Sequence, residues 1–253
     1  MQLPILDPFS LQAFPIVGHA LRQPNGLLAT GGDLSVDRLL LAYRNGIFPW
    51  YSAGEPILWW SPDPRMIFHT DRIHVSRRLA RSLRSCPWKV RADTAFRDVM
   101  RACAQPRPDQ PTTWINTEML AAYGQLHDTG HAHSVEVFDD ETLIGGIYGV
   151  AIGRMFFGES MFGNVTGASK AALLALCHAL ELWRWPLLDA QVQSDHLETL
   201  GAQLMPRREF IGNIENLVEQ PGEIGSWTER FPMIEVAALG GLRRRMRESA
   251  APS

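Results

Sequence analysis

The sequence has 253 residues, of which 45% are hydrophobic and 20% are charged, and its formal net charge at pH 7 is −3. This length is enough to bury a substantial core in one large domain or two small ones. The slightly acidic balance excludes a generally basic nucleic-acid coat, so any contact with RNA must come from a local patch. Three widely separated cysteines without a CxxC pair, Cys86, Cys103 and Cys177, favour reduced thiols and a cytoplasmic protein.

No targeting or membrane segment is expected. The first residues lack a basic stretch, and Pro4, Asp7, Pro8 and Pro15 interrupt the apolar residues near the N-terminus. A spanning helix needs about 20 consecutive apolar residues, and no such run is visible. Residues 1–35 are rich in proline and glycine and predict a loop-heavy region with one or two short strands.

The segment over residues 35–65 predicts one helix followed by an irregular connection. Ser35 is a good N-cap for a helix that Asn45 and Gly46 end. Residues 46–65 then hold three of the eight tryptophans and four of the seventeen prolines. Because proline fixes φ and lacks an N–H group, we expect neither a regular helix nor a central strand there. The aromatic rings either pack this connection onto the core or stack on a nucleobase.

A basic helix is predicted over residues 76–85. Arg77, Arg81 and Arg84 fall at positions i, i+4 and i+7, so they share one face, and Arg78 flanks them. Such a face suits RNA phosphates, but an ordinary solvated helix surface has the same pattern.

The rest of the chain predicts two more helices, over residues 94–104 and 118–129, joined by a proline-broken loop at 105–113. From residue 133 the hydrophobic period changes to two. The expected elements are strands over 134–138, 143–152 and 154–162, a helix over 168–185, a strand over 187–192, and helices over 196–200 and 207–218. A meander followed by β-α-β-α predicts an α+β fold.

Three polar side chains on the predicted strands are candidates for chemistry. Asp189 and Gln191 lie on one face of an apolar strand, about 6–7 Å apart along the chain. Glu159 stands in the middle of another strand. The residues alone leave structural roles open, because Asp189 could cap a helix or pair with an arginine, and Glu159 could pair with Arg154 or Lys170.

Several blocks of sequence occur in a fixed order. They are residues 24–35 (PNGLLATGGDLS), 46–51 (GIFPWY), 59–65 (WWSPDPR), 158–162 (GESMF), 169–170 (SK), 189–191 (DAQ), 196–197 (HL) and 200–202 (LGA). This ordered set closely resembles the leucyl/phenylalanyl-tRNA–protein transferases. The resemblance covers roughly residues 14–210, and ordered blocks are far more specific than one short motif.

The resemblance implies a small N-terminal α/β domain, placed at residues 1–65, and a larger mixed-sheet domain at residues 66–235. The larger domain is expected to have the fold of the GCN5-related N-acetyltransferases (a GNAT-like fold). Residues 236–253 are simple and basic, match nothing in the family, and are expected to form a mobile tail.

The resemblance also implies an activity. These enzymes move Leu, Phe and, less well, Met from aminoacyl-tRNA to the free α-amino group of proteins that begin with Arg or Lys. The products enter N-end rule (N-degron) degradation. No cofactor and no metal are implied, and a cytoplasmic monomer is expected. The ranking of donors and of acceptors stays open.

By position, the resemblance assigns roles to residues. Asp189 and Gln191 match the catalytic pair. A cationic acceptor also needs carboxylates near the reacting ester, and from their chemistry Glu159 and Asp189 are the candidates. We expect Asp189 to orient Gln191 so that the amide oxygen polarises the attacking amine. Ile147 and Phe156 match the family's donor pocket, and the neighbouring Phe157 and Met161 are expected to line it as well. Adenosine stacking is expected on the matching rings of Tyr43, Trp50 and Trp114. From the residues alone, tRNA phosphates are expected on Arg77, Arg78, Arg81 and Arg84.

Other functions find less support in the sequence. His131 and His133 lack an Asp, Glu or Cys arranged to complete a zinc site. An acyl-CoA N-acetyltransferase would need a basic, glycine-rich pyrophosphate loop, but residues 163–168 contain no arginine. A non-catalytic tRNA-binding protein would make no demand for Asp189, Gln191 or an apolar slot.

Overall fold

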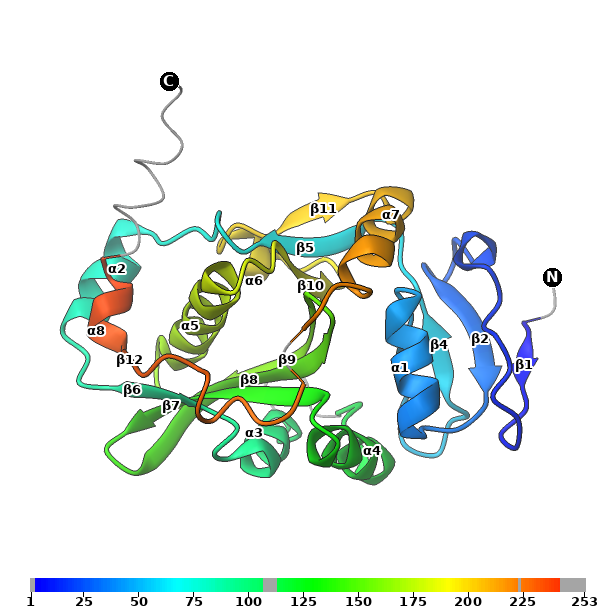
Figure 1. The fold of residues 1–253 in the computed structure, drawn as a ribbon, viewed down its shortest axis with the longest axis horizontal. Coiled ribbons are helices and arrows are strands. Elements are labelled where there is room, and N and C mark those ends of the chain that lie inside the picture. The colour runs from blue at the N-terminus through cyan, green and yellow to red at the C-terminus, as the bar shows by residue number, and fades with distance from the viewer. Residues whose placement is uncertain (1–2, 107–112, 223, 242–253) are drawn as a thin grey trace, which may run out of the picture.

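The computed structural model describes residues 3–106, 113–222 and 224–241. Two sheets organise them: a four-stranded sheet near the N-terminus and an eight-stranded sheet in the larger part (Figure 1). In the described ranges, no helix has the length and apolar character needed to cross a membrane.

The small sheet has the order β1-β2-β4-β3. Its strands are β1 (Ile5–Leu6), β2 (Leu27–Gly31), β3 (Phe48–Pro49) and β4 (Leu58–Trp60), with the short helix η1 (Val17–His19) before β2. The predicted helix after Ser35 is confirmed as α1 (Val36–Arg44), whose first turn is capped by the Ser35 hydroxyl. It stands between the two sheets (Figure 1), and its buried side chains connect them.

The expectation that the tryptophan- and proline-rich segment contains no central strand is wrong. β4 lies between β2 and β3 and pairs with both of them. The prolines do not prevent this pairing because none of them lies in β4. Pro49 lies on the edge strand β3, and Pro56, Pro62 and Pro64 lie outside the strands.

The large sheet has the order β11-β5-β10-β9-β8-β7-β6-β12. Its strands are β5 (Arg65–His69), β6 (Lys89–Ala92), β7 (Ala132–Asp139), β8 (Thr142–Ile152), β9 (Met155–Gly163), β10 (Leu187–Gln191), β11 (Gln203–Met205) and β12 (Ile234–Glu235). Neighbouring strands run antiparallel, except that β10 runs parallel to β9. The predicted meander and the strand after it are confirmed, and the α+β class with them. The strands β5, β6, β11 and β12 were not expected, because such short strands show too few alternations to reveal a period.

Helices cover both faces of the large sheet (Figure 1). They are α2 (Arg77–Arg84), α3 (Phe96–Cys103), α4 (Thr117–Asp128), α5 (Ala168–Leu182), α6 (Asp195–Glu198), α7 (Arg207–Leu217) and α8 (Val236–Leu239). α2, α5 and α8 lie on one face, whereas α3 and α4 lie on the other. All predicted helices are confirmed with shifted ends, and most of the predicted loop, at 107–112, lies outside the described residues.

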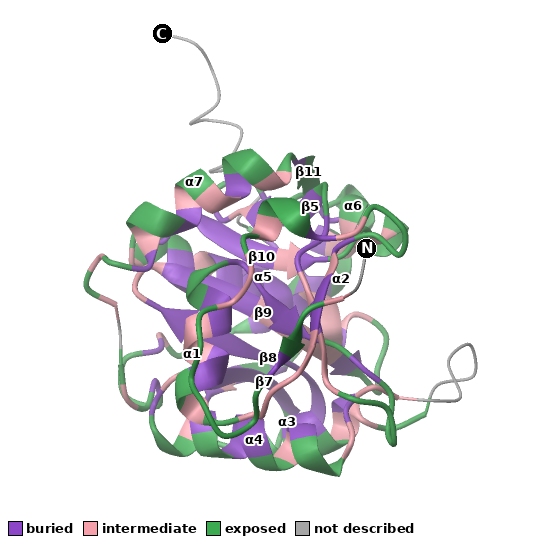
Figure 2. Cartoon of the chain, turned by 90° about the vertical axis from the view of Figure 1, so that its right-hand side faces the viewer, coloured by how far each residue is buried: buried purple, intermediate pink, exposed green. Residues whose placement is uncertain are grey.

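The core has two parts, one on each face of the large sheet. α5 supplies ten buried residues to its face and packs directly against β8. Gly145 permits that close approach, because a Cβ there would stand 2.6 Å from the Cβ of Ala168. The interior strands are buried, and the exposed residues lie mainly on the outer faces of the helices and on the loops (Figure 2).

The expected tail does not begin at residue 236. Val236 and Leu239 of α8 are fully buried, and α8 packs on α2, where the Arg84 guanidinium donates a hydrogen bond to the Gly240 carbonyl at 3.2 Å. Residues 236–241 are therefore part of the folded body, because their apolar side chains complete the core beneath α2. The rest of the predicted tail, 242–253, lies outside the described residues.

Candidate active site

The three polar residues singled out in the sequence lie where two neighbouring strands separate. β9 and β10 pair from Leu187 with Met155 up to Asp189 with Phe157, and no pair follows. Just after this point, the pairing of β9 with β8 is interrupted by a bulge whose extra residue is Glu159. The pairing of β10 with β5 is interrupted in the same way, and the extra residue there is Ala190. Bulges turn side chains out of the regular alternation.

The two bulges bring Glu159 and Gln191 together. The Gln191 side-chain amide donates a hydrogen bond to Glu159 Oε1 at 2.7 Å. Gln191 adopts φ +61°, a left-handed conformation that costs a residue with a side chain about 1–3 kcal/mol. Its backbone N–H donates to Asp189 Oδ1 at 2.9 Å, which stabilises this turn of the chain. The geometry at Gln191 therefore depends on the Asp189 carboxylate.

Two tyrosine hydroxyls enclose the Glu159 carboxylate. Tyr43 of α1 donates to Oε1 at 2.6 Å, and Tyr123 of α4 donates to Oε2 at 3.0 Å. Burial raises the pKa of Glu159 to about 8, and the negative charge of Asp189 adds to the effect, whereas the hydrogen bonds from the tyrosines and Gln191 oppose it. Glu159 bonds to these groups and not to Arg154 or Lys170. Carboxyls with raised pKa values that border a cleft are candidates for function.

The Asp189 carboxylate is bound by Arg65. The Arg65 guanidinium donates to both carboxylate oxygens, at 2.8 and 2.6 Å, and neither side chain is exposed to solvent. Asp189 thus makes the arginine pair left open in the sequence. It contacts the backbone of Gln191 and not its side chain, so its influence on a bound substrate must pass through Arg65 or Gln191.

A small pocket of about 90 Å³ opens on the α5 side of the separated strands, beside Glu159. Its apolar walls are Phe68, Ile147, Met161, Leu173, Leu188, Ala190 and Leu197. Two of the four predicted pocket residues, Ile147 and Met161, therefore line it. Phe156 is buried in the core on the same face, and Phe157 lies on the opposite face against the Tyr43 ring, at 5.2 Å.

Glu159 and Asp189, which were singled out from the sequence, also line this pocket, but its other apolar walls were not identified. Phe68, Leu173, Leu188 and Leu197 belong to four different elements, and each has the apolar character of an ordinary core residue. Nothing in a local pattern separates a pocket wall from the core beneath it. Tyr123 was also missed, since its hydroxyl reaches Glu159 only through the packing of α4 against the sheet.

Comparison with known proteins identifies the family. The family model described as leucyl/phenylalanyl-tRNA protein transferase matches residues 67–215, and the model of that transferase's N-terminal domain matches residues 32–63. The chain belongs to the leucyl/phenylalanyl-tRNA–protein transferase family. Among its relatives, a leucyl/phenylalanyl-tRNA–protein transferase of Xanthomonas campestris pv. campestris (strain B100) is 55% identical over 240 residues, which cover 94% of this chain and 96% of the relative.

A second transferase of the same name, from Xylella fastidiosa (strain M23), is 56% identical over 228 residues, or 90% of this chain and 94% of the relative. Among solved structures, a GCN5-related N-acetyltransferase-like protein from Streptococcus suis aligns with 64% of this chain and 60% of its own, at 14% identity and a TM-score of 0.29. The mixed sheet of the transferase agrees with the GNAT-like fold expected for the family's larger domain.

The residues expected to stack on adenosine differ in how far their rings are exposed to solvent. Trp50 is 40% exposed and lies 5.5 Å from the Trp60 ring. Trp114 is half-buried against the core on the α1 side of the sheet. Tyr43 is fully buried. Trp50 is therefore the most accessible of the three rings.

The predicted basic face lies on the outside of the transferase. Arg77, Arg78, Arg81 and Arg84 are all exposed on α2. Figure 1 places α2 on the side of the large sheet opposite to the small sheet and α1.

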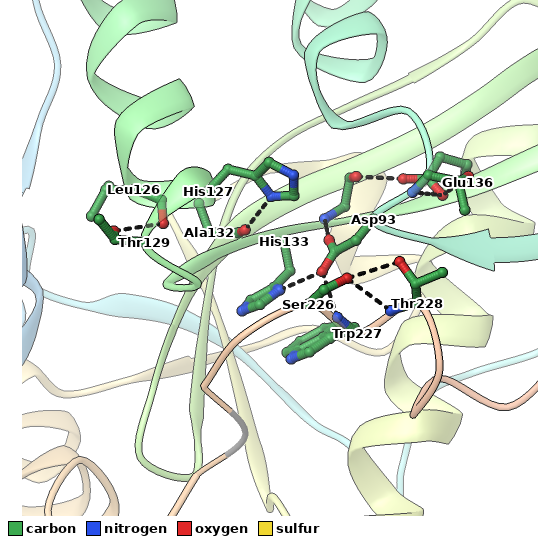
Figure 3. A network of polar contacts seen from close by, with 12 residues as sticks. Asp93, Leu126, His127, Thr129, Ala132, His133, Glu136, Ser226, Trp227 and Thr228 are labelled. Carbon is green, nitrogen blue, oxygen red and sulfur yellow. Dashed lines mark hydrogen bonds and ion pairs between the residues drawn. The ribbon is translucent and has the colours of Figure 1, made fainter.

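His133 contributes to a second polar network. His133 Nδ1 lies 2.8 Å from Asp93 Oδ2, and its ring stacks on Trp227 at 4.0 Å (Figure 3). Asp93 also accepts hydrogen bonds from the backbone N–H groups of Ser134 and Trp227, at 3.0 and 2.7 Å. In the described part of the chain, no three or more His, Cys, Asp and Glu side chains form a group that could hold a metal ion.

Proposed function

We propose that the protein transfers Leu or Phe, and less readily Met, from aminoacyl-tRNA to the α-amino group of proteins that begin with Arg or Lys. The observation that carries this proposal is the apolar pocket beside the paired side chains of Glu159 and Gln191. A site that joins an apolar acyl group to a cationic amine needs an apolar surface for the acyl group next to a polar or acidic surface for the amine.

The pocket would hold the side chain of the donor. Its walls are apolar and come from the sheet, α5 and the segment around α6, so Leu, Phe and Met fit its chemistry better than polar side chains. The terminal adenosine would stack on the open ring of Trp50, with Trp114 and Tyr43 behind it, because base–aromatic stacking contributes about 1–3 kcal/mol per base. The arginines of α2 would contact the phosphates of the same tRNA.

Glu159 would bind the cationic acceptor. A pKa of about 8 leaves most Glu159 side chains protonated at pH 7 in the free protein. An approaching Arg or Lys side chain or terminal ammonium group stabilises the carboxylate, so binding of the acceptor should release a proton. The hydrogen bonds from Tyr43 of α1 and Tyr123 of α4 would fix the orientation of this carboxylate.

The reaction itself needs little from the protein. The neutral α-amino nitrogen attacks the ester carbonyl, the new N–C bond replaces the ester C–O bond, and the proton lost by the amine ends on the ribose hydroxyl that leaves. An α-amino group has a pKa of about 7.7–8.0, so part of it is already neutral at pH 7. Holding the ester and the amine together is worth about 7–11 kcal/mol in well-oriented systems.

Gln191 is the group that we assign to the attacking amine. Its side-chain N–H donates to Glu159, and its carbonyl oxygen accepts no hydrogen bond from the described residues. It can therefore accept one from the amine. Asp189 would act through the backbone of Gln191 and not as a base, because both of its oxygens already accept hydrogen bonds. If Asp189→Asn and Gln191→Ala both retained turnover within a few-fold of wild type, these roles would be wrong.

The biological setting follows from the substrates. Charged tRNA and newly exposed protein N-termini occur together in the cytoplasm, so we place the protein there, acting as a monomer that marks its acceptors for N-end rule degradation. No cofactor takes part in this scheme.

One assay tests the reaction class. Purified protein is incubated with Phe-tRNA and peptides that begin with Arg, acetyl-Arg or Ala, with and without RNase. We expect transfer of Phe to the free Arg peptide alone, abolished by RNase. Acetyl-CoA serving as the donor in place of Phe-tRNA would overturn the proposal, as would binding of tRNA without any transfer.

A further inference from the structure

Arg65 occupies the junction between the two sheets. It is the first residue of β5, follows directly on the proline-rich segment after β4, and is fully buried. Besides the two bonds to Asp189, its guanidinium donates to the Gly46 carbonyl at 3.0 Å. The rings of Phe48 and Phe210 lie over it, at 4.8 and 4.7 Å. One side chain thus contacts the small sheet, the end of α1, β10 and α7.

The Gly46 carbonyl is a rigid partner for Arg65. Gly46 ends α1 with φ +68°, and a Cβ at this position would stand 2.6 Å from Ile211 of α7. The chain therefore passes tightly between α1 and α7, where only glycine fits. Because the guanidinium is also planar and held between two rings, it has one orientation in which its three bonds form together.

These contacts continue to the pocket and return to α1. Arg65 holds both oxygens of Asp189, Asp189 holds the backbone of Gln191, Gln191 donates to Glu159, and Glu159 accepts from Tyr43. Tyr43 and Gly46 stand at the same end of α1. The hydrogen-bonded circuit therefore ties the helix next to the small sheet to both bulges of the large sheet.

We infer that Arg65 is a positioning residue for aminoacyl transfer, which holds the Gln191 bulge in register with α1 and the small sheet. The inference rests on the proposed function, since it concerns the place where the amine is attacked. Arg65 contacts neither substrate. It acts through Asp189. The hydrogen bonds to both Asp189 oxygens and to the Gly46 carbonyl need the forked guanidinium group, and a positive charge alone would not form them.

Arg65→Lys is the informative variant, with Arg38→Lys as its matched control. A lysine keeps the positive charge but cannot bond both Asp189 oxygens and the Gly46 carbonyl at once. Arg38 is likewise fully buried and bonds one carboxylate, Asp33 at 2.9 Å, and two backbone carbonyls, but none of its partners belongs to the site. Both variants remove the same kind of buried contact.

The measurement is the single-turnover rate of Phe transfer to an Arg peptide, per folded molecule and at saturating tRNA. For Arg65→Lys we expect a loss of about 10–100-fold, since misplacement by about 1 Å can cost 10²-fold, with the KM for Phe-tRNA nearly unchanged. For Arg38→Lys we expect a rate within about twofold of wild type. Equal rates for the two variants would overturn the inference. Absence of transfer by the wild-type protein would instead overturn the proposed function.

A second readout does not depend on activity. Hydrogen exchange at the backbone amide of Gln191 should accelerate at least tenfold in Arg65→Lys and stay unchanged in Arg38→Lys, because the N–H would lose a fixed acceptor. The double variant R65M/D189L replaces the ion pair by apolar groups, which often preserves stability. We expect it to fold and to transfer as slowly as Arg65→Lys. Transfer at the wild-type rate by this variant would contradict a positioning role.

Discussion

The large sheet contains two buried polar networks that look alike in their electrostatics and differ in their surroundings. The site network joins Glu159, Gln191, Asp189, Arg65 and the two tyrosines, whereas the β7 network joins Asp93, His133, Ser134, Glu136 and Thr94 (Figure 3). Each contains a glutamate with a strongly raised pKa. Burial raises the pKa of Glu136 to about 7, against hydrogen bonds from Ser134 and Thr94, and that of Glu159 to about 8.

The difference lies in what each network borders. Glu159 lines a pocket, and its hydrogen-bond partners come from α1, α4 and β10. Glu136 is fully buried, and its partners Ser134 and Thr94 lie on β7 and on the turn before α3. The β7 network instead fastens the segment around Trp227 to the sheet through Asp93. A raised pKa therefore marks burial in both places and does not by itself identify a site. What distinguishes Glu159 is that this carboxyl residue itself lines an apolar pocket, whereas Glu136 is fully buried.

The largest expected effect separates the networks by their aspartates. Asp189→Ala leaves Arg65 buried without its partner, and the removal of one member of a buried ion pair costs about 3–5 kcal/mol of unfolding free energy. We expect transfer per folded molecule to fall about 100-fold as well. Asp93→Ala should cost about 1–3 kcal/mol, because it leaves buried hydrogen-bond donors unpaired, and should keep transfer within about twofold. Urea denaturation and single-turnover assays check both. A similar loss of transfer in Asp93→Ala would contradict the distinction between the networks.

The two glutamates test the same distinction on substrate binding. Glu159→Gln removes the charge that an acceptor would meet, so we expect the KM for the Arg peptide to rise about 10–100-fold, with a smaller change for Phe-tRNA. Glu136→Gln, a substitution of equal size and chemistry on β7, should change neither KM by more than about twofold. Steady-state kinetics with each substrate varied in turn provide the test. A larger effect of Glu159→Gln on the tRNA than on the peptide would count against the assignment.

The pH dependence of stability sharpens the comparison further. Both glutamates have folded-state pKa values above their ordinary value of 4.5, so both hold protons that the unfolded chain has already released. Their contributions are fully present below about pH 4.5 and are lost as the pH rises, up to about 7 for Glu136 and about 8 for Glu159. Each group lowers the unfolding free energy by about 1.4 kcal/mol per pH unit within its window.

Glu159→Gln should therefore remove the part of this slope that persists between pH 7 and 8, whereas Glu136→Gln should remove slope only below pH 7. Urea unfolding at half-unit pH steps from 4.5 to 9 measures both windows. If the slope between pH 7 and 8 survived in Glu159→Gln, the protonated state assigned to this carboxyl would be wrong.

The smallest expected effect lies outside both networks, on the basic face of α2. Arg77→Ala and Arg81→Ala should each weaken tRNA binding a few-fold and lower the slope of log affinity against log salt by about 1, without changing the KM of the acceptor peptide. Filter binding between 50 and 300 mM salt measures the slope. Arg97→Ala on α3, an exposed arginine paired with Asp128, is the control. An equal change of slope in Arg97→Ala would show that α2 does not contact tRNA more than other exposed arginines do.

Much of the fold was predictable because its signals are local. The caps of α1 and α2 and the alternation of the meander depend on neighbours within a few residues, and the structure confirms them. The ordered blocks of sequence also pointed to Glu159, Asp189 and Gln191 before any geometry was known. The strand β4 was missed because composition places prolines in a segment without showing on which side of a strand they fall.

The amino-acid sequence by itself determined the secondary structure around the site, the family and the polar residues that deserve a test. Only the tertiary structure decided what these residues do to one another. Asp189 pairs with Arg65, 124 residues away, and together with the Gln191 N–H this pairing engages both carboxylate oxygens. Both bulges arise from pairing between strands, and the apolar pocket walls come from six separate elements. Such contacts join residues that are distant along the chain, and a periodic pattern carries information only about residues that are close.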